Sequence, residues 1–79
     1  MHLCISGFLL DASEDDSMKF EFDVPAHREK EVMAVMKWKV FAEGAEGEFV
    51  LSHTQIQQIE KVLGTRLPSN LALYIAVEA

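Results

Sequence analysis

The chain has 79 residues, of which 49% are hydrophobic and 25% are charged, and its net charge is −6. This length predicts one domain, residues 1–79, without room for a second hydrophobic core. The negative charge argues against a nucleic-acid-binding protein, which needs a basic surface, and against attraction to an anionic membrane. An acidic domain is instead steered toward cationic partners.

The N-terminal residues and the single cysteine indicate the compartment. Cys4 cannot form an internal disulfide, which a small secreted domain usually needs. The apolar residues 1–10 lack the basic flank of a signal peptide and are too short to span a membrane. We therefore expect a cytoplasmic protein.

Two strands are predicted at the start of the chain. Residues 2–10 read as a buried strand, with Leu3 and Ile5 on one face, and residues 18–23 alternate between apolar and charged side chains. Such alternation is typical of a strand with one face in water. Residues 11–17 between them form a polar loop, so the two strands most simply make an antiparallel hairpin.

The next segment predicts a helix whose end is ambiguous. Pro25 suits the first turn of a helix, and the apolar positions continue a helical stripe from residue 26 to about residue 37, with Val40 on the same stripe. Residues 36–40 also alternate as a strand would. Whether 37–42 is helix end or strand stays open. Residues 42–47, with two glycines, form a loop in either case.

A second helix is predicted in the C-terminal half of the chain. After a short strand at 48–51, Ser52 and Gln55 have the spacing of a capping box, in which each side chain bonds to the backbone N–H of the other residue. Ile56 and Ile59 belong to its apolar stripe, and Gly64 is suited to end the helix in a left-handed conformation.

Residues 71–77 predict a last strand, whose second face, with Tyr74 among small residues, we expect to be partly covered. The predicted order is then β-β-α-β-α-β. An α+β fold with a four-stranded, mainly antiparallel sheet and both helices on one face would bury every apolar stripe.

No catalytic or nucleotide-binding motif occurs. His2 and Cys4 share a strand face and could both reach a metal, but His27 and His53, which would have to complete the site, have no diagnostic spacing. A cysteine in an apolar strand is a poor nucleophile because burial disfavours the thiolate. The sequence therefore predicts no enzyme, cofactor or metal.

Two features point to partner binding. Acidic residues cluster in two loops, which could occupy a basic cleft by imitating phosphates, and a tryptophan lies near the second of them. A solvated loop and a core aromatic side chain are the alternatives. The candidate partner-binding residues are Asp11, Glu14, Asp15, Asp16, Trp38, Glu43, Glu46 and Glu48.

Several segments resemble a group of small bacterial proteins. These are Ser6-Gly7-Phe8 and 20–25 in the first half, and 49–52, Gln55-Ile56, Leu63-Gly64 and 74–78 in the second. They are similar to the immunity proteins encoded beside bacterial toxins, including those of contact-dependent growth inhibition.

This resemblance implies a cytoplasmic protein that binds one cognate toxin domain and blocks its active site, without catalytic residues of its own. A nuclease toxin fits best, because an RNA-binding cleft is basic and would attract acidic loops. The alternative is a small cytoplasmic regulatory or accessory module that binds another protein. Whether the domain forms a homodimer stays open.

Overall fold

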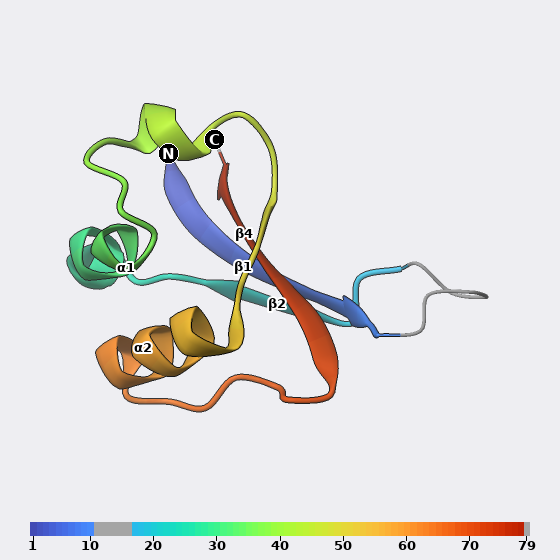
Figure 1. Ribbon diagram of the computed structural model, residues 1–79. Coiled ribbons are helices and arrows are strands. Elements are labelled where there is room, and N and C mark those ends of the chain that lie inside the picture. The colour runs from blue at the N-terminus through green and yellow to red at the C-terminus, as the bar shows by residue number, and fades with distance from the viewer. Residues whose placement is uncertain (11–16, 79) are drawn as a thin grey trace.

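The computed structural model describes residues 1–10 and 17–78. Figure 1 shows its helices and strands in the predicted order β-β-α-β-α-β. Two short 3-10 turns, η1 and η2, lie before and after the first helix. The elements are β1 (His2–Leu9), β2 (Phe20–Asp23), η1 (Ala26–Arg28), α1 (Glu29–Val35), η2 (Phe41–Gly44), β3 (Phe49–Val50), α2 (His53–Leu63) and β4 (Leu71–Glu78).

The four strands form one antiparallel sheet in the order β2-β1-β4-β3. Its centre is the pair of the first and last strands, which run side by side from His2 opposite Glu78 to Leu9 opposite Leu71. His2 and Glu78, near the two ends of the chain, therefore lie at the same end of the sheet (Figure 1). β1 and β2 form the predicted antiparallel hairpin.

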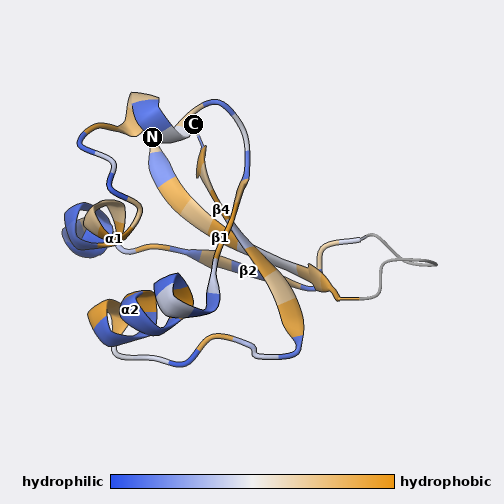
Figure 2. Ribbon diagram, viewed as in Figure 1, coloured by the Kyte–Doolittle hydropathy of each residue, from blue (hydrophilic) through white to orange (hydrophobic). Residues whose placement is uncertain are grey.

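The core lies on one face of this sheet. Leu3 and Ile5 of β1 and Ile75 of β4 are fully buried, together with Val32 of α1 and Ile59 of α2. Full burial of one such side chain contributes about 1.5–3 kcal/mol. Both helices thus cover the same face, as predicted, and Figure 2 shows hydrophobic residues along the two central strands.

The ends of α2 follow local side-chain chemistry. The Gln55 N–H donates to the Ser52 hydroxyl at 3.2 Å, and the Ser52 N–H donates to the Gln55 side-chain oxygen at 2.9 Å. Gly64 ends the helix with φ 69°, in the left-handed region that glycine adopts without steric cost. The capping box and the glycine stop are both confirmed. Ile56, predicted as buried, is half-buried.

α1 ends earlier than expected, at Val35, and residues 36–40 are neither helix nor strand, while Phe41 and Ala42 belong to the 3-10 turn η2. A Schellman motif closes the helix: the Lys37 N–H donates to the Ala34 carbonyl at 3.1 Å, and the Trp38 N–H donates to the Met33 carbonyl at 2.9 Å. Lys37 occupies the left-handed position with φ 62°. The strand interpretation of this segment was wrong, and the helical one extended α1 about two residues too far.

The chain leaves α1 in a new direction because of this turn. Val40, expected on the apolar stripe of the helix, is 55% exposed instead. Phe41 then begins η2, and the start of the helical region is likewise split, since η1 precedes α1. The 12-residue helix suggested by the apolar spacing is therefore a 3-10 turn followed by two turns of α-helix.

Candidate functional site

The second face of the sheet carries no helix within the described residues, because α1 and α2 both pack on the other one. Strand pairing fixes which side chains point there, since every residue next to a core-facing one points to the opposite side. We call this surface the open face. Its residues are His2, Cys4, Ser6, Phe8, Glu21, Asp23, Val50, Ala72, Tyr74, Ala76 and Glu78.

Apolar side chains occupy the centre and one edge of the open face. The rings of Phe8 and Tyr74 meet edge to face, with centroids 5.7 Å apart and an interplanar angle of 80°. Val50, which is 64% exposed, pairs with Tyr74 from the edge strand β3. Ala72 and Ala76 leave the backbone of β4 near the surface. The result is a shallow apolar surface that carries one aromatic pair.

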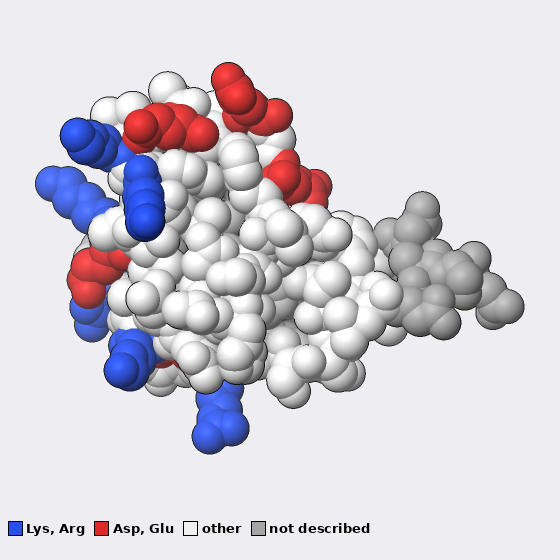
Figure 3. Space-filling view, in the orientation of Figure 1, with Lys and Arg blue, Asp and Glu red and all other residues white. Residues whose placement is uncertain are grey.

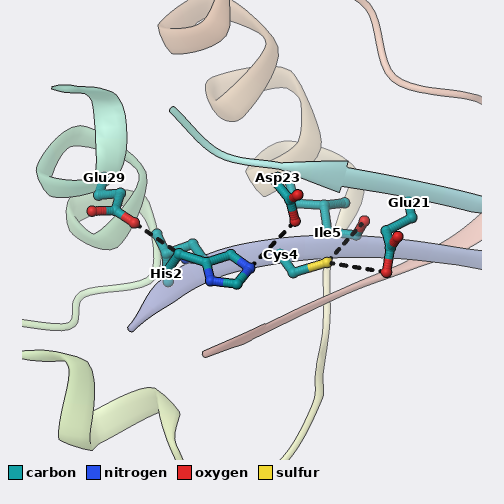
Figure 4. Close-up of polar contacts among 7 residues, drawn as sticks. His2, Cys4, Ile5, Glu21, Asp23 and Glu29 are labelled. Atoms are coloured by element: carbon teal, nitrogen blue, oxygen red, sulfur yellow. Dashed lines mark hydrogen bonds and ion pairs between the residues drawn. The ribbon is translucent and has the colours of Figure 1, made fainter. Parts of the chain in front are cut away.

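Carboxylates lie at the end of the open face nearest the chain termini. Asp23 is opposite Cys4 in the β1–β2 register, and Glu78 is opposite His2 in the β1–β4 register. Figure 4 shows His2 pointing toward Asp23, with the His2 Nε2 atom 3.3 Å from the Asp23 Oδ1 atom. The Cys4 Sγ atom lies 4.0 Å from a Glu21 carboxylate oxygen.

Cys4 is 2% exposed although it points to the open face, because the side chains around it cover it. Burial raises the pKa of its thiol from 9.0 to about 12, and the carboxylates of Glu78, Glu21 and Asp23 add to the rise. Burial disfavours the thiolate because it loses solvation, and the negative neighbours disfavour it further by like-charge repulsion. The thiol is therefore protonated at neutral pH, which makes nucleophilic catalysis by Cys4 unfavourable.

Ligand atoms of Cys4, Glu21 and Glu78 lie within 4.8 Å of one another, so this group could hold a metal ion. It differs from the set that the sequence suggested, because His27 lies in η1 and His53 begins α2. A bound cation would also have to displace the thiol proton. The absence of a metal stays a prediction.

Trp38, a predicted partner-binding residue, is half-buried against the core. Its ring packs edge to face on Phe49, with centroids 5.1 Å apart. Gly44 packs against the Trp38 ring, and a Cβ atom added at Gly44 would come within 2.5 Å of the indole. These contacts give Trp38 a packing role, which was the alternative interpretation of this residue.

Glu43 has a structural role as well. Its carboxylate accepts hydrogen bonds from the backbone N–H groups of Lys39 and, at 3.2 Å, of Val40. Both bonds lower the pKa of Glu43 because they stabilise the charged carboxylate, and the bond from Lys39 has the larger effect. Val40 has no side-chain acceptor, so only the carboxylate half of a capping box is present at η2.

Glu46 and Glu48, the other predicted residues of this loop, are exposed. Glu48 directly precedes β3, and alternation places it on the same side as Val50. It therefore extends the acidic part of the open face. The predicted residues Asp11, Glu14, Asp15 and Asp16 lie outside the described residues.

The open face itself was not predicted from the sequence. The alternation of 18–23 and the shared face of His2 and Cys4 were visible, but neither shows which strands lie next to one another. Only the pairing of β1 with both β2 and β4 places Glu21, Asp23 and Glu78 around Cys4. The cover expected over Tyr74 comes from side chains of the sheet itself.

The charges of the described residues separate in space. In Figure 3, acidic side chains gather over η2 and the segment that leads to β3, and basic side chains lie mostly over the helical side. No helix within residues 1–10 and 17–78 has the length and apolar character that crossing a membrane requires. No family model matches the chain, and neither a curated protein nor a solved structure is significantly similar to it.

Proposed function

We propose that this protein binds a basic protein through its open face, and that the partner is a bacterial toxin domain which it neutralises. One observation carries the proposal: a sheet face without a covering helix combines the exposed Val50 and the half-buried pair of Phe8 and Tyr74 with a group of carboxylates. Neither half would suffice alone, because scattered apolar residues and solvated acids are both common on protein surfaces.

The two halves have different roles in binding. Acidic groups steer a cationic partner and raise the association rate, whereas desolvated apolar contacts set the dissociation rate. Tyrosine is enriched among the residues that dominate binding energy. Tyr74, held edge to face by Phe8, is the natural anchor, with Val50 beside it.

The size of the face indicates what else must contribute. The two central strands have eight residues each, and four strands leave three inter-strand spacings, so the face measures at most about 26 by 14 Å, because β2 and β3 are shorter. That is about half of the roughly 800 Å² that each partner buries in a standard interface. The exposed segment 45–48, with Glu46 and Glu48, adjoins the face and would extend it.

In the toxin-binding form of the proposal, the protein acts by occlusion. The resemblance to immunity proteins supports this form, and a basic nuclease cleft is complementary to the carboxylates of Glu21, Asp23 and Glu78. No step needs a reactive group of this chain, which agrees with the protonated state of Cys4.

The test is co-expression with the product of the adjacent gene, scored by cell survival and by co-purification. Val50→Arg places a cation on the open face, and Val40→Arg is its matched control on the helical side, because both valines are more than half exposed. We expect Val50→Arg to abolish protection and Val40→Arg to retain it. Equal effects of the two variants, or no association at all, would contradict the proposal.

The acidic half is tested separately with Glu21→Gln combined with Glu78→Gln. Association should slow and lose most of its salt dependence in this variant. Glu31→Gln is the control, because Glu31 is exposed on α1, where it pairs with Arg28 at 3.0 Å. If the partner is instead a cytoplasmic protein without toxicity, the binding effects remain but protection is never observed, which favours the regulatory-module alternative.

A further inference from the structure

A groove on the helical side has the opposite charge character to the open face. It lies between α1 and the segment that leads into η2, and its volume is about 490 Å³. This volume is within the range of about 300–1,000 Å³ that is typical of small-molecule sites. Among the residues that line it are Ala26, Lys30, Met33, Lys39, Val40 and Phe41, and His27 and Glu29 also line it.

The floor of the groove is apolar. Met33 is 7% exposed and Phe41 is half-buried, so the base is part of the folded core. Val40, at 55% exposed, forms one wall, and it owes this position to the turn at Lys37 that ends α1. A hydrocarbon group placed here would cover Val40 without displacing a buried side chain.

The rim is cationic. Lys30 and Lys39 line the groove, and within the described residues neither forms an ion pair with a carboxylate. The one acid of the lining, Glu29, is directed toward β1, where its carboxylate accepts a hydrogen bond from the Leu3 N–H at 3.3 Å (Figure 4). Lys39 also interacts electrostatically with the Glu43 carboxylate, whose pKa it helps to lower. Within the described residues neither lysine is held in an ion pair, so both ammonium groups can meet an anion although the whole chain is acidic.

From this combination we infer that the groove binds a small amphiphilic carboxylate. Its hydrocarbon part lies against Met33, Val40 and Phe41, and its carboxylate meets Lys30 and Lys39. The inference is independent of the proposed function, because it concerns other residues on another side of the molecule. Charge complementarity selects the ligand class: an amine of the same length would meet the lysines with like charge.

The experiment is a titration of the full chain, followed by amide chemical shifts, with octanoate, octan-1-ol and octylammonium as probes at equal ionic strength. We expect octanoate to shift the amides of Lys30, Met33, Val40 and Phe41 and to bind about 5- to 10-fold more tightly than octanol, as two exposed ion pairs permit. Octylammonium should bind more weakly than octanol.

The variant Lys30→Gln combined with Lys39→Gln should reduce octanoate affinity to that of octanol. Lys61→Gln is the matched control, because Lys61 is an exposed lysine of α2 that does not line the groove. Lys30, Lys39 and Lys61 are all exposed, so we expect these substitutions to leave the core unchanged. Equal affinity for octanoate and octylammonium, shifts confined to other residues, or no shifts at millimolar octanoate would overturn the inference.

Discussion

The two helices end in different ways. α2 has 11 residues, a reciprocal capping box at Ser52 and a glycine in the left-handed position that follows it. α1 has seven residues, its N-cap residue Arg28 makes no side-chain cap bond, and a lysine occupies the equivalent left-handed position. A non-glycine residue in this conformation costs roughly 1–2 kcal/mol.

The difference shows what determines the ends of each helix. The ends of α2 are set by residues within the helix and its caps. The end of α1 is set by packing, because Trp38, the residue after Lys37, must reach Phe49 and Gly44, which lie beyond the helix and its caps. The contact between Trp38 and the core compensates for the strained turn.

The largest effect is expected where α2 meets the sheet. Ile59 is fully buried in the core, so Ile59→Ala should lower the free energy of unfolding by about 2–5 kcal/mol. Chemical denaturation followed by circular dichroism measures this change. Val50→Ala, on the open face, is the control and should cost little. A loss below 1 kcal/mol at Ile59 would contradict the proposed packing of α2.

The packing that ends α1 is tested at Gly44. A methyl group there would overlap the Trp38 ring, so Gly44→Ala should cost about 1–3 kcal/mol through overpacking. Tryptophan fluorescence during denaturation reports both stability and the altered environment of the ring. In a Trp38→Leu background the cost of Gly44→Ala should shrink, and a double-mutant cycle measures that coupling. Additive effects would show that the contact does not matter.

The same contrast explains what the sequence could predict. α2, the strands and their faces follow from short-range patterns: the Ser52–Gln55 spacing, Gly64, and period-two alternation. The end of α1 could not be predicted, because Lys37 is not a residue that marks a left-handed turn and Gly44 has no local signal of its contact with Trp38. The helical and strand interpretations of 37–42 both assumed that the local sequence pattern determines where α1 ends.

Prediction of the candidate site from the sequence is limited in the same way. Alternation places Glu21 and Asp23 on one side of their strand and Glu78 at the end of another, but only pairing brings all three to Cys4. The sequence therefore directed attention to the two acidic loops. In the loop that the structure describes, the Glu43 carboxylate accepts a hydrogen bond from the backbone N–H of Val40 instead of facing a partner. A surface formed by four strands needs the strand order before it can be recognised.

Removing the cap of α2 is expected to have a smaller effect. Ser52→Ala deletes the acceptor of the Gln55 N–H and should cost about 1 kcal/mol, within the usual range of 0.5–2 kcal/mol. Ser52→Asp, which keeps an acceptor, should retain most of the stability. Thermal unfolding of the three proteins at equal concentration checks the order, and equal stability of Ser52→Ala and the parent protein would contradict a capping role.

The smallest effect has the opposite sign, because Lys37→Gly should stabilise the protein. Glycine relieves roughly 1–2 kcal/mol of left-handed strain at φ 62°, but it adds about 0.4–1 kcal/mol of conformational entropy to the unfolded chain, which leaves a net gain of about 0.5–1 kcal/mol. Lys37→Ala removes the same charge while keeping the strain, so it should gain nothing. If both variants gained equally, charge and not backbone conformation would be the cause. If only glycine gains, α1 carries at its end a strain that α2 avoids with Gly64, and the packing of Trp38 is what maintains it.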